Sequence, residues 1–401
     1  MIRSFWREGI AQAATIALVS IVVSSCSDDP SALNSVGTQL LRTKIIVKTD
    51  TLKTINSSTA RQYVPMDGRT NLLGRSGGPN GYAAYTLVQF YPAYLPQRDT
   101  VQILSATLSL RGETLFGDST ATFGFTAYRI NRAWDQITFR WDSLTSFYDS
   151  NPVSDTYFQG VGRDTQWVNV NLDTAMVRKW LQPLTFTDNF GVILIPGQNT
   201  NVVRGVHTFG YDVDSLYPQL VVVARNLAGT VTDTTVYKIG QDTFVGNIDN
   251  LDSNPELIYV QAGVSYRGFL KFDVATIPRG AIINQARLSL AYSPAASRLN
   301  RFTTDTAIAA HLMLSATDNR QFEVGAAVGT LDTLTPNRFV FDIRHDVQYW
   351  IKDPTLNNGL IFRTVNRSEF SSFDLFALYN QTTQDSSKRP QLIVKYTVES
   401  N

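Results

Sequence analysis

A short segment with two tryptophans carries the side chains best suited to ligand binding in this 401-residue chain. Trp134 and Trp141 flank Asp135 and Arg140, and Tyr148 follows closely. A flat indole ring can lie against the apolar face of a sugar, while carboxylate, guanidinium and phenol groups form hydrogen bonds with hydroxyls. The segment therefore predicts a carbohydrate-binding site made of these five residues. The alternative is that both tryptophans pack under a loop as core or rim residues.

No local pattern in the sequence predicts catalysis. His207, His311 and His345 lie in strand-like or helical segments without a nucleophile-elbow pattern nearby, so a Ser-His-Asp triad is not indicated. No spacing selects one pair of carboxylates for glycoside hydrolysis from the 34 acidic residues. The glycine-rich residues 77–81 lack the Lys-Ser/Thr ending of a phosphate-binding loop. We therefore expect a protein that is not an enzyme.

One acidic loop raises the question of a metal ion. Residues 249–254, Asp-Asn-Leu-Asp-Ser-Asn, offer closely spaced oxygen ligands of the type that calcium prefers, without following the EF-hand pattern. Aspartate and asparagine are equally typical of ordinary turns. We expect no cofactor and no metal site, with calcium at this loop as the alternative.

The N-terminus resembles the signal sequence of a bacterial lipoprotein. Arg3 and Arg7 precede an apolar run over residues 13–23, which is too short for a membrane-spanning helix. The run ends in Val-Ser-Ser-Cys, which resembles a lipobox whose cleavage leaves Cys26 as a lipidated N-terminus. Cys26 is the single cysteine of the chain. The alternative is a free thiol after an ordinary signal peptide.

The lipobox divides the N-terminus into a signal peptide over residues 1–25 and a lipidated tether over residues 26–41. Several acyl chains on Cys26 would hold the protein stably in a membrane. Ser27 is compatible with sorting to an outer membrane, and the acidic residues 28–29 resemble a signal for export to the cell surface. The expected location is the outer membrane, with the protein exposed at the surface.

Composition favours a folded β protein without a nucleic-acid partner. The 35 basic and 34 acidic residues give a formal net charge of +1, which leaves no excess to neutralise phosphates. Hydrophobic residues make up 43% of the chain, enough to bury a core. The 22 Phe and 17 Tyr, against 4 Met, favour strands over helical bundles.

Strands and two short helices account for most of the chain. Residues 44–47, 106–110, 191–195 and 220–223 are examples of short β-branched runs bounded by turn residues. Apolar residues at helical spacing predict one short helix in each half, each followed by a proline, and we expect its tryptophan to fill the core. The helical residues are Val177, Trp180 and Leu181 in the first half, and Ile343, Val347, Trp350 and Ile351 in the second.

The two halves repeat one another. Five short segments recur in the same order about 170–180 residues apart. This repetition predicts one module over residues 42–225 and a second over residues 231–397. The paired segments are 87–90 with 269–272, 106–110 with 286–290, 177–180 with 347–350, Gly191 with Gly359, and 218–222 with 390–394.

These landmarks resemble the DNRLRE domain family of bacterial extracellular and surface proteins. The resemblance rests on residues 87–90, 95–96, 106–110, 128–129, 134–141, 177–180, 190–191 and 218–220. It implies β-sandwich modules, with carbohydrate binding in some members and a structural role at the cell surface in others. The second module keeps residues 358–360 and 389–392 but has no counterpart to Trp134 and Trp141.

Together these observations predict an all-β protein with two antiparallel β-sandwich, jelly-roll-like modules, each with one short helix, after a lipoprotein signal peptide. Our leading hypothesis is a non-catalytic surface lipoprotein that binds or retains polysaccharide or another cell-surface component. The first module would carry the ligand, and the second would be a spacer or a docking module. The alternative is a scaffolding lipoprotein that contacts other surface proteins and binds no glycan.

Overall fold

The computed structural model describes most of the chain beyond the predicted tether. The described residues are 44–61, 70–75, 82–90, 101–117, 120–159, 166–182, 188–208, 214–226, 228–247, 251, 254–263, 266–299, 307–315, 326–365 and 372–400. The predicted signal peptide, Cys26 and the tether lie outside them, as do residues 77–81.

Eleven antiparallel strands form the first body, the closed barrel. Six of them follow one another around a ring in the order β13-β12-β5-β11-β3-β4, and β13 pairs with both β12 and β4 to close it. The strands are β3 (Thr70–Arg75), β4 (Ala83–Phe90), β5 (Val101–Gly117), β6 (Phe123–Ile130), β7 (Tyr148–Pro152), β8 (Tyr157–Gln159), β9 (Gln166–Asn171), β10 (Val192–Pro196), β11 (Val202–His207), β12 (Gln219–Asn226) and β13 (Thr232–Asn247).

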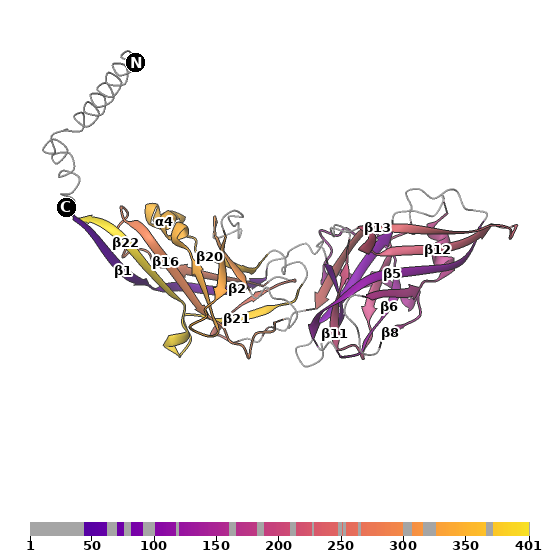
Figure 1. The fold of residues 1–401 in the computed structure, drawn as a ribbon, viewed down its shortest axis with the longest axis horizontal. Coiled ribbons are helices and arrows are strands. Elements are labelled where there is room, and N and C mark those ends of the chain that lie inside the picture. The colour runs from indigo at the N-terminus through magenta and orange to yellow at the C-terminus, as the bar shows by residue number, and fades with distance from the viewer. Residues whose placement is uncertain are drawn as a thin grey trace, which may run out of the picture.

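Nine antiparallel strands curl into the second body, the half-barrel, which lies beside the closed barrel in Figure 1. A small sheet of β14 (Leu257–Gln261) and β21 (Leu375–Tyr379) contributes apolar side chains to the same core. The nine strands are β1 (Lys44–Leu52), β2 (Thr54–Arg61), β15 (Tyr266–Phe272), β16 (Ile282–Ala291), β17 (Ile308–Leu312), β18 (Ala327–Leu331), β19 (Arg338–Asp342), β20 (Leu360–Thr364) and β22 (Gln391–Ser400).

The first strands of the two repeats are exchanged between the bodies. β1 pairs with β22 and β2 pairs with β15, so the strands that open the first repeat complete the sheet of the second. β13 opens the second repeat, yet it pairs with β12 and β4 of the first. β1 and β2 are separated only by Lys53 and lie at opposite ends of the nine-stranded order. In both bodies, therefore, a stretch of chain from the other repeat completes the sheet.

Because of this exchange, the boundaries of the two bodies differ from the boundaries of the two sequence repeats. The closed barrel takes all its strands from residues 70–247, whereas the predicted first module covers 42–225. The half-barrel combines residues 44–61 with strands from residue 266 onward. The all-β class, the antiparallel pairing and the two short α-helices are confirmed.

An asparagine before β10 and another before β20 make the same contact. The side-chain amide of Asn189 donates to the carbonyl of Phe90 at the end of β4, with a distance of 2.6 Å. The amide of Asn357 donates to the carbonyl of Phe272 at the end of β15, with a distance of 2.9 Å. Both asparagines are buried, so each bond satisfies a backbone carbonyl that water reaches poorly.

The glycines that lie two residues after these asparagines also correspond to each other in the two bodies. Gly191 has φ +84° and Gly359 has φ +91°, a region that favours glycine. A Cβ atom at Gly191 would lie 2.0 Å from the carbonyl oxygen of Val88, and one at Gly359 would lie 2.5 Å from that of Leu270. Only glycine lets the incoming chain approach its partner strand this closely.

The two α-helices place a tryptophan in each core, as the sequence predicted. α3 (Thr174–Trp180) begins at Asp173, whose carboxylate accepts a hydrogen bond from the Ala175 amide at 2.7 Å. α4 (Arg344–Lys352) covers the half-barrel. Trp180 is 2% exposed and Trp350 is 0% exposed.

The two bodies meet at a small apolar cluster. Phe373 from the second repeat lies between Tyr82 and Phe244, with ring centroids 5.3 Å and 5.8 Å away. The Arg298 guanidinium lies 5.1 Å from the centre of the Tyr82 ring. Burial raises the pKa of the Tyr82 phenol, so the group stays protonated at neutral pH. Gln261 donates to its hydroxyl at 3.4 Å.

A half-buried carboxyl on α4 predicts a pH-dependent stability. Burial raises the pKa of Asp346 to about 6, above its ordinary value of 3.8. An acid whose pKa is raised by folding reduces stability above that pKa, and the cost disappears as the pH falls toward 3.8. We expect Asp346→Asn to increase the free energy of unfolding by on the order of 1 kcal/mol near neutral pH.

Urea denaturation across the pH range checks this expectation. The gain from Asp346→Asn should shrink as the pH falls through about 6. A gain that is equal at acidic and neutral pH would show that the carboxyl charge is not its cause.

Candidate functional site

The loop that joins β6 to β7 carries most of the predicted ligand residues. Asp135 organises it, because one carboxylate oxygen accepts hydrogen bonds from the amides of Ile137 and Thr138 at 3.0 Å and from the Thr138 hydroxyl at 3.1 Å. This turn directs Phe139 back toward the barrel, where it is 7% exposed. A 3₁₀ turn, η1 (Trp141–Leu144), follows.

The loop packs on the outer face of the closed barrel, opposite the main core. Leu87 of β4, Ile193 of β10 and Val245 of β13 are buried beneath it. Phe139 and Phe147 stack over these aliphatic side chains with their ring centroids 4.5 Å apart. The loop is therefore held by its own apolar cluster, which fixes the position of the side chains at its surface.

Trp134 is fixed at three points. Its indole N–H donates to the carbonyl of Phe190 at 2.8 Å, and its ring meets Phe139 nearly edge-on at 6.1 Å. Its own carbonyl accepts a bond from the Gln241 side chain of β13 at 3.2 Å. The side chain is half-buried, so part of the indole still faces solvent.

An open hollow of about 650 Å³ lies against this tryptophan. Trp134, Phe139 and Phe147 supply its aromatic lining, and four polar residues stand among them. The polar residues are Arg132, Asp135, Thr138 and Ser143, and Ala133 completes the lining. Phe139 and Phe147 are 7% and 3% exposed, so the half-buried indole of Trp134 is the ring against which a ligand could stack.

A second group of aromatic rings lies on the same outer face, and we call it the aromatic patch. It consists of Trp141, Tyr85, Tyr128 and Tyr148, all half-buried against the same apolar cluster. Trp141 packs at a tilt against Tyr85, with ring centroids 4.8 Å apart, and Tyr128 packs at a tilt against Tyr148, with centroids 5.6 Å apart. Burial raises the pKa of the Tyr148 phenol, which keeps it a hydrogen-bond donor at neutral pH.

Three arginines occupy different environments around the loop. Arg132 lines the hollow, lies 5.4 Å from the centre of the Phe147 ring and donates to the Thr145 carbonyl at 2.7 Å. Arg129 pairs with Asp149 at 2.7 Å. Arg140 is exposed and lines neither the hollow nor the aromatic patch.

The five predicted residues are therefore divided among three places. Trp134 and Asp135 line the hollow, Trp141 and Tyr148 belong to the aromatic patch, and Arg140 stands apart. Sequence reasoning missed Thr138, Phe139 and Ser143 as lining residues. Their signal was the Asp-x-x-Thr spacing of residues 135–138, which predicts the turn that brings them together.

The acidic loop and the three histidines are the other residues that the sequence singled out. No three His, Cys, Asp or Glu residues lie close enough together there to hold a metal ion, and most of the acidic loop at 249–254 lies outside it. His207 and His311 are buried in strands. Burial lowers the pKa of His207, and His311 accepts a bond from Arg363 at 2.9 Å. His345 is exposed on α4.

Comparison with known proteins adds no family assignment. No protein-family model and no curated protein matches the chain. The resemblance to the DNRLRE domain family thus stays a prediction. Among the described residues, no helix has the length and apolar character needed to cross a membrane.

Proposed function

We propose that this protein is a non-catalytic surface lipoprotein that binds or retains polysaccharide through the hollow beside Trp134. The observation that carries the proposal is the lining of that hollow, in which the half-buried indole of Trp134 stands among four hydrogen-bonding side chains. Sugar rings present apolar C–H faces and polar hydroxyl edges, and this lining offers a partner to both.

The surroundings of the hollow support an extended ligand. The aromatic patch lies on the same outer face and leaves parts of four more rings at the surface. The hollow is open, so a chain could continue past it on either side. Each contact is modest, and we expect a dissociation constant of about 10⁻⁵ to 10⁻³ M for one site.

The cellular setting of the proposal comes from the N-terminal sequence. Lipid on Cys26 would anchor the chain in the outer membrane, and the tether would let the two bodies reach outward from the surface. Each body would act as one jelly-roll-like sandwich module. The position of β14 and β21, which pack into the core of the half-barrel, supports a second layer there.

A scaffolding role is the alternative, and one exposed row of side chains favours it. Val47 on β1 and Ile282 on β16 both lie opposite Thr397 of β22, so the three form one cross-strand row. Val47 and Ile282 are each 64% exposed. An apolar row of this kind suits contact with another protein. Loss of a specific cross-linked partner on changing Val47→Ser would favour this role.

The binding proposal predicts that the two tryptophans contribute unequally. We expect Trp134→Ala to weaken glycan binding at least tenfold, because it removes the wall of the hollow. Trp141→Ala should have a smaller effect, because its ring contacts Tyr85 outside the hollow. Isothermal titration calorimetry with the soluble chain from Ser27 onward measures both.

Trp167→Ala is the matched control for these variants. Trp167 lies in the same barrel on β9, is 39% exposed and does not line the hollow. Thermal melting separates binding from folding, since half-buried tryptophans also contribute to stability. Cooperative melting with unchanged binding in Trp134→Ala would contradict the proposal, and loss of cooperative melting would make Trp134 a core residue.

A further inference from the structure

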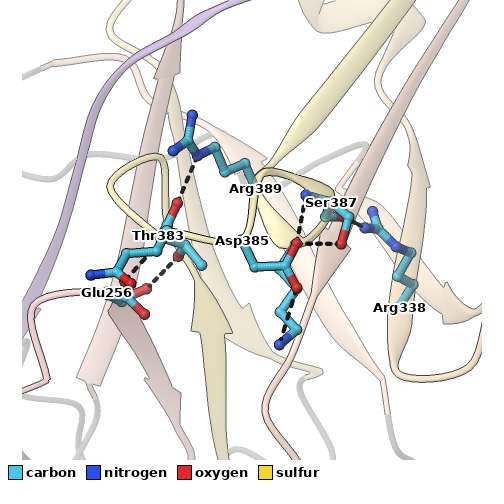
Figure 2. A network of polar contacts seen from close by, with 8 residues as sticks. Glu256, Arg338, Thr383, Asp385, Ser387 and Arg389 are labelled. Carbon is cyan, nitrogen blue, oxygen red and sulfur yellow. Dashed lines mark hydrogen bonds and ion pairs between the residues drawn. The ribbon is translucent and has the colours of Figure 1, made fainter.

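A second hollow, of about 470 Å³, lies in the half-barrel beside the loop between β21 and β22. Three separate segments form it, and they contribute Glu256, Ser293 and residues 383–385, among others. Figure 2 shows three of its lining residues, Glu256, Thr383 and Asp385. The tryptophan pair of the first repeat does not line this hollow. Comparing the sequences of the two repeats therefore does not predict it.

Hydrogen bonds fix the loop that borders the hollow. The Arg389 side chain donates to the Thr383 carbonyl at 2.7 Å, and the Thr383 hydroxyl donates to the Glu256 carbonyl at 3.1 Å. Arg338 reaches across from β19 to the carbonyl of Ser387, as Figure 2 shows. The hollow is therefore preorganised, which reduces the entropy lost when a ligand binds.

Two carboxylates line the hollow, and backbone amides set their orientation. Glu256 accepts a bond from the Gln384 amide at 2.8 Å, and Asp385 accepts one from the Ser387 amide at 3.0 Å. The bonds from Ser387 hold the pKa of Asp385 below its ordinary value, so the group is ionised at neutral pH. A carboxylate has about four acceptor positions, so each retains capacity for a ligand hydroxyl.

An aromatic ring and a cation complete the lining. Tyr379 is half-buried and packs against the apolar cluster of β14 and β21. The Lys388 ammonium lies 5.1 Å from the centre of the Tyr379 ring and 3.3 Å from a carboxylate oxygen of Asp385. The Lys388–Asp385 pair is almost half exposed, and such pairs contribute little stability, so a ligand can displace Lys388 from the ring at low cost.

We propose that this hollow is a second, independent binding site that takes a neutral saccharide. The charges disfavour an anion, because two carboxylates stand against one ammonium. A cation would have to compete with Lys388 for Asp385. An apolar ligand would leave the polar lining without partners. A sugar unit supplies hydroxyls for Glu256 and Asp385 and an apolar face for Tyr379.

The test uses the soluble chain with Trp134→Ala and Trp141→Ala, so that the first hollow cannot contribute. Saturation-transfer NMR and calorimetry with neutral oligosaccharides, namely fragments of mannan, laminarin, xylan and starch, should detect one binding class. Glu256→Gln should weaken that binding at least tenfold while keeping the bond from Gln384, because the amide oxygen can accept it. Tyr379→Ala should weaken it as well.

Glu399→Gln on β22, outside the hollow, is the matched control and should bind like its parent. Absence of binding by every neutral fragment to the folded tryptophan variant would overturn the proposal, as would equal binding by Glu256→Gln and its parent. The proposal for the first hollow has its own test. It is contradicted if Trp134→Ala leaves glycan binding unchanged in a chain that already carries Glu256→Gln.

Discussion

A fragment of residues 70–247 should fold alone, whereas a fragment of residues 42–225, which ends with the first sequence repeat, should not. The 42–225 fragment lacks β13, which pairs with both β12 and β4. It also removes the buried side chains of Tyr237, Ile239 and Phe244. At about 1.5–3 kcal/mol for each buried side chain, this loss approaches the total stability of an ordinary domain.

Circular dichroism melting and amide hydrogen exchange measure the difference. The 70–247 fragment should melt cooperatively and protect the amides of β4 and β12. The 42–225 fragment should aggregate or exchange rapidly, because both strands have an unpaired edge. Cooperative melting of the 42–225 fragment at the same temperature as the 70–247 fragment would contradict the exchange of strands.

The reciprocal experiment tests the same exchange in the half-barrel. A chain without residues 44–61 should lose protection in β15 and β22, because β2 and β1 are their partners. A synthetic peptide of residues 44–61, added in excess, should restore that protection. Residues 232–247, which pair with the closed barrel, make the matched control peptide and should restore less.

The second large effect concerns Gly191. Gly191→Ala should destabilise the closed barrel by about 4 kcal/mol or more, because its Cβ atom would lie 2.0 Å from the Val88 carbonyl oxygen. Two backbone segments would have to separate to relieve this contact. Gly359→Ala should act in the same direction in the half-barrel, where the contact with Leu270 is 2.5 Å. Urea denaturation measures both.

Alanine substitutions at two other glycines distinguish the cost of steric contact from the cost of backbone strain. Gly229 has φ +71° with nothing within 4 Å of an added Cβ atom, so alanine there should cost about 1 kcal/mol from conformation alone. Gly280 has open space and no positive φ, so alanine there should be nearly neutral. If Gly191→Ala costs no more than Gly229→Ala, close approach of the chain is not what requires glycine at residue 191.

Patterns among neighbouring residues were sufficient to predict the fold class and the two described helices. The β-branched runs bounded by turn residues appear in the structure as parts of strands β1, β5, β10 and β12. Helical spacing with a nearby proline placed Trp180 and Trp350 correctly in the cores. These features depend on residues close together in the sequence.

The exchange of strands could not be predicted in the same way. The segments 44–61 and 232–247 are both strand-like, and sequence pattern alone does not say which sheet each completes. Pairing of residues this far apart depends on chain connectivity and on the whole core rather than on local pattern. The closed ring follows from the same pairing, so the barrel was as difficult to foresee as the exchange.

The candidate site was predictable only as a region. The residue types between Trp134 and Tyr148 indicated a ligand surface, but the direction of each side chain depends on the turn that Asp135 makes. That turn brings Phe139 and Trp134 to one hollow and leaves Arg140 outside it. Adjacency in the sequence suggested that Arg140 and Trp141 act together with Trp134, whereas the loop separates them.

The most direct test of the proposed function is a fluorescence titration of the soluble chain from Ser27 onward with neutral and acidic polysaccharides. Four of its tryptophans, at residues 134, 141, 167 and 180, lie in the closed barrel, so binding at the hollow should change their emission. We predict a saturable change with one class of glycan, which a soluble fragment of that glycan reverses and Trp134→Ala abolishes. No change with any polysaccharide, in a protein that melts cooperatively, would contradict the proposal and favour the scaffold.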